Sequence, residues 1–147
     1  MDWNYLLLSP QGRIGRQSFW IGFAVVMGLS ILCNLVPIVG QIAGLLLFWP
    51  QACIHSKRLH DMGHSAWLML VPFGVALAIG AIAAVTGSIS ILGAMTGHVG
   101  TAAAGGAMTI LAMGCAFLVG LAFLLWVGLT PGQPGPNRFG EDRLSPA

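Results

Sequence analysis

The side chains that could do chemistry in this sequence lie in three short segments, residues 11–20, 57–67 and 130–140. These segments contain five of the six basic residues of the chain. Lysine and arginine bind phosphate through charge-assisted hydrogen bonds, and lipid headgroups at the inner leaflet carry such anions. We therefore predict an anion site. Its candidate residues are Arg13, Arg16, Lys57, Arg58, His60, Asp61 and Arg138.

A catalytic or metal-binding role would use the second of these segments. General-base catalysis would need Asp61 to orient His60, but adjacent residues point in different directions on most backbones. A metal site would combine His60 and His64 with Asp61 or His55, and Gly63 interrupts the helix that this spacing requires. We therefore expect no catalytic residues, no metal and no cofactor.

A structural role for the charged residues is the third interpretation. Asp61 would then cap the helix that follows it or pair with Arg138, and the other cations would set the orientation of the chain. In the anion-site interpretation, the backbone N–H groups of residues 63–65 would add donors at the start of that same helix. The sequence leaves both interpretations open.

The composition of the chain requires lipid as a second solvent. Charged residues make up 7% of the 147 residues and hydrophobic residues 56%, and the mean hydropathy is +0.86. Soluble domains contain about 25% charged residues, so this chain could not cover a water-facing surface. The net charge of +2 and the absence of a Lys/Arg run exclude a nucleic-acid partner.

The spacing of the charges predicts four membrane-spanning helices. Formal charges are absent between Arg16 and Lys57 and again between Asp61 and Arg138, and each gap accommodates two helices of about 20 apolar residues. The predicted helices are residues 17–36, 40–55, 65–86 and 107–129. The expected fold is all-α: a polytopic helical membrane domain, residues 17–129, with four transmembrane helices in two hairpins.

This topology places all the basic residues on one side of the membrane. An interfacial segment (1–16), a loop (56–65) and a Pro/Gly-rich tail (130–147) would face the cytoplasm, and a Gly/Ala-rich connector (87–106) would lie outside. All six basic residues then obey the positive-inside rule, whereas a fifth span would export Arg138 and Arg143. We predict a multi-pass protein of the bacterial inner membrane with both termini cytoplasmic. The sequence leaves the conformation of residues 87–106 open.

Three ordered motifs resemble the bacterial inner-membrane family called domain of unknown function 805 (DUF805). The first is Gly12-Arg13 and Gly15-Arg16 followed by Phe19-Trp20. The second consists of Arg58, Leu59, His60, Asp61, Gly63, Ser65 and Trp67, and the third of Pro134, Gly135, Asn137, Arg138, Phe139 and Gly140. The resemblance implies a helical membrane fold and no particular activity, because the family has no assigned function.

We expect a non-enzymatic module whose cytoplasmic basic face binds anionic membrane lipids or a partner protein. One alternative is an oligomeric transporter or channel for a small solute or a lipid, and a homo-oligomer or a membrane-protein partner remains open. A second alternative is a membrane enzyme that acts on a phosphorylated lipid through His60 and Asp61. No Asp, Glu, Lys or Arg lies inside a predicted helix, which disfavours an ion-coupled carrier.

Overall fold

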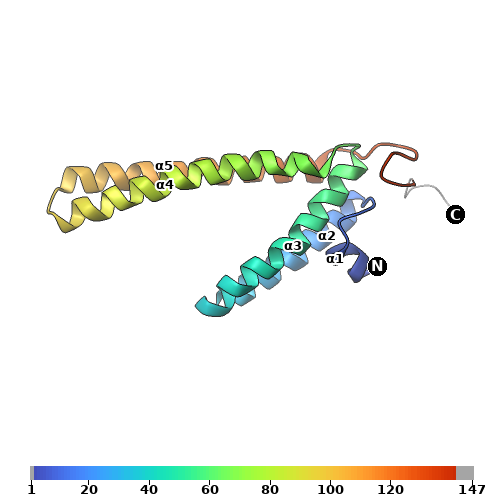
Figure 1. Ribbon diagram of the computed structural model, residues 1–147, viewed down its shortest axis with the longest axis horizontal. Helices are drawn as coiled ribbons and strands as arrows, with labels where there is room; N and C mark the ends of the chain where they lie inside the picture. Colours follow the sequence, from blue (N-terminus) through green and yellow to red (C-terminus); the bar gives the residue numbers. More distant parts are fainter. Residues whose placement is uncertain (1, 142–147) are drawn as a thin grey trace. The chain divides into compact units, whose positions relative to one another are not determined.

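The chain is almost entirely helical. The structure, a computed structural model, describes residues 2–141 (Figure 1). Its elements are α1 (Trp3–Leu8), α2 (Arg16–Asn34), α3 (Pro37–Asp61), the short 3₁₀ helix η1 (Ala66–Met69), α4 (Leu70–Met95) and α5 (Val99–Leu129). These described residues contain no β-strand and a single isolated bridge, between Asn137 and Gly140.

Four helical stretches are long and apolar enough to cross a membrane, which confirms the predicted all-α membrane fold. The four stretches are Arg16–Asn34, Ile38–Asp61, Ala66–Met95 and Val99–Leu129. A continuous helix satisfies its own backbone hydrogen bonds, which lipid cannot do for it. The arrangement of the four helices as two membrane hairpins stays a prediction.

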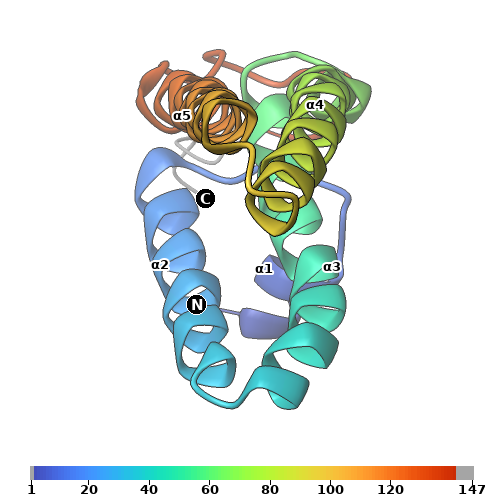
Figure 2. The same ribbon diagram turned by 90° about the vertical axis from the view of Figure 1, so that its left-hand side faces the viewer.

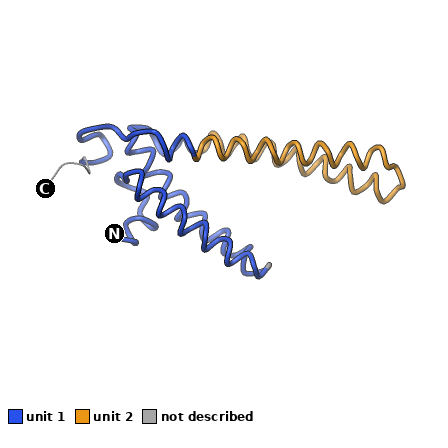
Figure 3. Tube along the Cα trace, turned by 180° about the vertical axis from the view of Figure 1, so that it is seen from behind, with its two compact units in different colours: residues 1–69, 125–147 blue, residues 70–124 orange. Residues whose placement is uncertain are grey.

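The helices belong to two compact units (Figure 3). Unit 1 contains the chain up to Met69 and the chain from Leu125 onward, and unit 2 is Leu70–Leu124. Unit 1 therefore holds α1, α2, α3, η1 and the last residues of α5, and it also holds all three polar segments.

In unit 1, α2 and α3 run side by side in opposite directions (Figure 2), and α1 packs against α3. Gly22 of α2 makes the close packing possible, because a Cβ there would lie 3.1 Å from Ile54 Cδ1 of α3 and 3.2 Å from Leu6 Cδ2 of α1. The Trp49 Nε1–H group donates to the Leu8 carbonyl over 3.3 Å and so holds the end of α1 against α3.

The third element, α3, is longer than the sequence predicts. Its predicted limits are residues 40–55, but it begins at Pro37 and continues to Asp61. The predicted loop 56–65 is therefore helical through Asp61, and only its last four residues leave the helix. The prediction ended the helix at its first charges, whereas Lys57 and Arg58 find hydrogen-bond partners inside the protein and remain helical.

Unit 2 contains two helices that continue through the Gly/Ala-rich connector, where the prediction had ended them at residues 86 and 107. The α4 helix runs to Met95 and α5 begins at Val99, so residues 87–106 extend both helices. Thr86 and Thr109 share a hydrogen bond of 2.9 Å, and a Cβ on Gly105 would lie 2.8 Å from the Ser90 backbone nitrogen. In lipid, small residues allow such close backbone packing, which explains why this composition forms helix.

The length of α5 predicts that its first turns extend beyond the hydrocarbon layer. Its 31 residues span about 46 Å, against roughly 30 Å of hydrocarbon. A tilt of about 40°, the upper end of the usual range, would still leave roughly 35 Å along the membrane normal. We expect the turn at Thr96 to react with a membrane-impermeant maleimide when Thr96→Cys is made in a protein whose three native cysteines are replaced by alanine.

Leu118→Cys is the matched control for this labelling, because Thr96 and Leu118 are both exposed on the protein surface and differ in depth. Leu118 lies eleven residues, about 16 Å, before the end of α5, and it should be protected by lipid. Equal protection at both positions would contradict the predicted extension.

Candidate functional site

The three polar segments meet at one end of unit 1 around four buried ionisable side chains. We call these residues, Arg13, Lys57, Arg58 and Asp61, the buried charge cluster. Lys57 and Arg58 are 0% exposed, Arg13 is 2% exposed and Asp61 is 8% exposed. Charges this deeply buried persist only when they are paired and hydrogen-bonded, so their partners decide what the site can do.

Asp61 is the acceptor at the centre of the cluster. Its Oδ1 lies 3.2 Å from Arg13 Nε, and its Oδ2 forms an ion pair with Arg58, three residues earlier on α3. Arg138, one of the alternatives that the sequence offered for Asp61, lies elsewhere: its guanidinium is over the ring of Phe139, 4.6 Å from the ring centroid. The Asp61 side chain also faces Gly132 so closely that a Cβ on Gly132 would collide with the carboxylate.

Arg58 caps the C-terminal end of α5. Its Nε donates to the Val127 carbonyl over 3.0 Å, and its guanidinium also donates to the Thr130 carbonyl. The last carbonyls of a helix have no partner within the helix and carry partial negative charge, so a buried cation there is favourable. A further bond to the Ile14 carbonyl, 3.4 Å, connects Arg58 to the segment before α2.

Arg13 holds the C-terminal tail. It donates to the carbonyls of Gln133, over 2.6 Å, and Gly135, over 2.7 Å. Three backbone oxygens and one carboxylate therefore surround the Arg13 guanidinium, since Gly140 O lies 3.4 Å away as well. A side chain with this set of acceptors has little capacity left for an external anion.

Lys57 holds α1. Its ammonium group donates to the Leu6 carbonyl over 2.7 Å and to the Tyr5 carbonyl, and it lies 4.5 Å from the centroid of the Tyr5 ring. These carbonyls belong to the last turns of a six-residue helix, where a cation replaces the missing hydrogen-bond partners. Lys57 is thus an internal anchor for the N-terminal segment.

The end of α3 explains the glycine of the second motif. Gly63 has φ of +76°, its N–H donates to the His60 carbonyl over 3.0 Å, and the His64 N–H donates to the Leu59 carbonyl over 2.8 Å. This pair of bonds is a Schellman motif, which needs the left-handed conformation that glycine adopts most easily. Two of the backbone donors predicted for an anion in residues 63–65 are therefore already occupied.

His60 is part of the packing between the tail and α3. Its Nδ1 lies 3.2 Å from the Gly12 carbonyl oxygen, and its ring stacks on Phe139 with the centroids 4.0 Å apart. Asn137 donates to the His60 carbonyl over 3.0 Å. The structure does not pair His60 with Asp61, whose carboxylate is bonded to the two arginines. Within residues 2–141, no group of three or more His, Cys, Asp or Glu side chains could hold a metal ion.

A cavity of ≈ 650 Å³ opens beside the cluster, within the size range of ligand sites. Residues 15–18 line it from the start of α2, residues 131–134 line it from the tail, and Arg58 and Asp61 border it. The N-cap residue Gly15 makes no side-chain capping bond, and the first turn of α2 has no acidic residue. The positive end of the helix dipole and its free N–H groups therefore face this cavity.

Arg16 also borders this cavity. Its side chain is exposed, and within the described residues it takes part in no hydrogen bond and no ion pair. It lies near enough to Arg58 for the two like charges to repel. With Arg13, Arg16 and Arg58 beside the single carboxylate of Asp61, this end of unit 1 carries excess positive charge.

The structure thus gives the predicted site residues different surroundings. Arg13, Lys57, Arg58 and His60 are bonded to the protein's own backbone, and Arg138 packs on Phe139. Arg16, Arg58 and Asp61 are those that border the cavity. Gln17 and Ser18 also line it and were missed, although their place directly after a glycine at the start of an apolar helix would have indicated free N–H donors.

Comparison with known proteins gives a family and no activity. The family model described as "Protein of unknown function (DUF805)" matches residues 7–141. The chain is 42% identical over 73 residues to "Uncharacterized protein YiiR" of Escherichia coli (strain K12), covering 44% of this chain and 50% of that protein. It is 29% identical over 92 residues to "Inner membrane protein YhaH" of the same organism, covering 50% of this chain and 76% of that protein. The chain therefore spans half the length of YiiR, and no solved structure matches it.

Proposed function

The chain belongs to the DUF805 family, and because that family has no assigned activity, we propose a function from the cavity at the start of α2. In this proposal the protein is a non-enzymatic inner-membrane module that binds the phosphate of an anionic lipid headgroup there. The observation that carries the proposal is the exposed Arg16, which has no protein partner among the described residues and borders the cavity.

The chemistry of the cavity favours an anion. Free N–H groups at a helix N-terminus bind phosphate and carboxylate, and the helix dipole adds to the attraction. Arg16 would supply a charge-assisted hydrogen bond to the same ligand. A bound anion would also relieve the repulsion between Arg16 and Arg58. This relief would stabilise the bound state in addition to the direct contacts.

The position of the cavity favours a lipid over a free anion. Arg16 is the first residue of α2, the first of the four membrane-spanning candidates, so its guanidinium lies where hydrocarbon gives way to headgroups. Trp20, one turn later, is an aromatic residue of the kind enriched at this level. If both termini are cytoplasmic, as the positive-inside rule favours, the cavity faces the inner leaflet and its anionic lipids.

An Arg16→Gln variant tests the proposal. We expect the protein, released from gentle detergent in native mass spectrometry, to retain phosphatidylglycerol in preference to phosphatidylcholine, and the variant to lose roughly tenfold of this preference, the effect of one charged hydrogen bond. The thermal midpoint should stay the same or rise slightly, because Arg16 makes no internal bond and repels Arg58.

Arg138→Gln is the matched control, since it removes one exposed cation from the same end of unit 1. It should leave the lipid preference unchanged. Equal losses in both variants would show only nonspecific attraction and would overturn the proposal. Absence of any lipid preference in the wild type would do the same and would direct attention to an acidic segment of a partner protein.

A further inference from the structure

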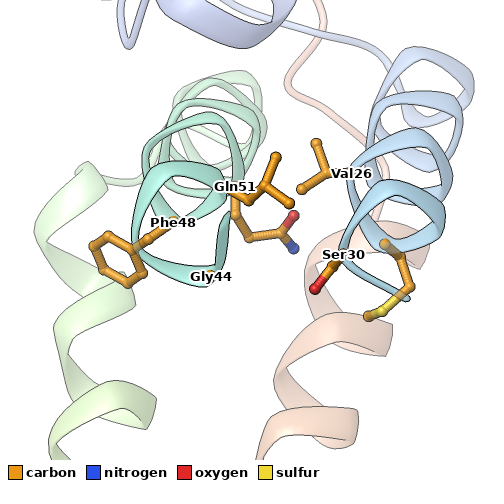
Figure 4. A pocket seen from close by; sticks show the side chains of 7 residues that line it. Val26, Ser30, Gly44, Phe48 and Gln51 are labelled. Carbon is orange, nitrogen blue, oxygen red and sulfur yellow. The ribbon is translucent and has the colours of Figure 1, made fainter. Parts of the chain in front are cut away.

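A second, smaller pocket lies between α2 and α3, away from the cavity at the start of α2 (Figure 4). Its volume is ≈ 240 Å³, and its lining includes Val26, Met27 and Ser30 from α2 and Gly44, Phe48 and Gln51 from α3. Figure 4 shows the Gln51 side chain extending from α3 toward α2, where Ser30 lies on the facing helix. The pocket is thus apolar except for one amide and one hydroxyl group, which come from facing helices.

Neither of these polar groups is satisfied by the part of the protein that the structure describes. The carbonyls of Ser30 and Gln51 accept bonds from Asn34 and from His55, but the Ser30 hydroxyl and the Gln51 amide take part in no hydrogen bond. The Ser88 hydroxyl, by contrast, donates to the carbonyl four residues earlier, over 2.8 Å. The Ser30 hydroxyl is therefore available to a ligand.

The depth of Gln51 makes water and phospholipid headgroups poor partners for its amide. Gln51 precedes the end of α3 by ten residues, about 15 Å, and Ser30 follows the start of α2 by fourteen residues, about 21 Å. Ser30 is also only four residues, about 6 Å, from the other end of α2 and lies nearer that side of the membrane. With roughly 30 Å of hydrocarbon, Gln51 lies near the centre of the membrane. An unsatisfied amide there costs several kcal/mol, so a partner soluble in the membrane interior would stabilise the protein.

We propose that this pocket binds a membrane-soluble molecule that carries a carbonyl or hydroxyl oxygen on an apolar body, the chemistry shared by prenylated quinones and long-chain prenyl alcohols. The Gln51 N–H and the Ser30 O–H groups donate to a carbonyl, and the Gln51 oxygen accepts from a hydroxyl. The volume accommodates one ring or a short length of chain, and the rest of the molecule lies in lipid. This proposal does not depend on the headgroup site.

Saturation binding in nanodiscs of phosphatidylcholine tests the pocket with two probes, a short-chain prenylated benzoquinone and a prenyl alcohol of the same chain length. The first variant, Gly44→Leu, fills the pocket. A Cβ on Gly44 meets no atom within 4 Å, and leucine favours helix over glycine, so the fold should persist. The second variant, Gln51→Leu, removes the amide without removing an internal side-chain bond. We expect each variant to weaken binding of the preferred probe by about tenfold or more.

Each variant has a matched control outside the pocket lining. Gly28→Leu places leucine at another helical glycine with nothing within 4 Å of its Cβ, and Gln41→Leu removes an exposed amide from the same helix, α3. Both controls should bind as the wild type does. Preference for the quinone or for the alcohol would identify the ligand's polar group.

Three results would overturn the proposal. The first is a wild type that binds neither probe, which would leave the pocket without the predicted ligand class. The second is a pocket variant that binds as tightly as its control. The third is a Gln51→Leu protein with a changed oligomeric mass in the nanodisc and intact probe binding, which would make a second copy of the chain the partner of Gln51.

Discussion

An Arg58→Met variant is expected to lose about 3–5 kcal/mol of unfolding free energy, the range for removing one partner of a buried ion pair. Burying the Arg58 charge is itself costly, and methionine removes that cost while filling much of the same volume. The lost interactions should still outweigh this gain. Asp61 keeps only Arg13 as a partner, and the carbonyls of Val127 and Thr130 lose their donor. Buried acceptors without a partner cost about 1–3 kcal/mol each.

Denaturant titration of the purified protein in detergent would measure this loss, with Arg16→Met as the control. Arg16 carries the same side chain a short distance away but makes no internal bond among the described residues, so its substitution should stay within about 0.5 kcal/mol of the wild type. Similar losses for the two variants would contradict the internal role assigned to Arg58.

The four spans could be predicted because a charged side chain inside the lipid is so costly that spans contain almost none. Two long gaps, Arg16 to Lys57 and Asp61 to Arg138, were sufficient to identify them. The ends of the helices could not be predicted in the same way. A charged residue ends a helix only if it needs water, and Lys57 and Arg58 have backbone carbonyls of other segments as partners.

The Gly/Ala-rich connector shows a second limit of prediction from composition. Glycine favours turns and loops in water, and residues 87–106 were therefore separated from the adjoining helices. In lipid the same residues bring two helices into contact, as the Ser90 hydroxyl bond to the Ala102 carbonyl, 2.6 Å, illustrates. Whether small residues form a loop or a helix contact depends on whether water or lipid surrounds them. The sequence does not show which of the two surrounds each residue.

The clustering of the charged residues could be predicted, but their pairing could not. Clustering of cations at one end followed from topology, whereas the choice of Arg13 over Arg138 as the partner of Asp61 required the fold. Both arginines are far from Asp61 in the sequence, and only the path of the tail decides between them. The glycines on either side of the Arg13-Ile14 pair, Gly12 and Gly15, are the signal that this segment is irregular and can pack inside.

An Asp61→Ala variant is expected to lose a similar amount, about 3–5 kcal/mol, because it leaves two buried arginines without their shared carboxylate. A double-mutant cycle then identifies the partner. Arg13→Met should destabilise the wild type more than it destabilises Asp61→Ala, with a coupling energy of about 1–3 kcal/mol. In the Asp61→Ala protein the Arg13 guanidinium keeps its bonds to the tail but lacks its counter-charge, so part of its contribution is already lost.

Arg138→Met provides the comparison for this cycle, because its guanidinium lies over Phe139 and not on Asp61. Residues without a shared partner have additive effects within about 0.5 kcal/mol, so the Arg138 change should destabilise Asp61→Ala and the wild type equally. Denaturant titration of the six proteins measures both couplings under one condition. Coupling to Arg138 together with additivity at Arg13 would reverse the pairing and make Arg138, not Arg13, the partner of Asp61.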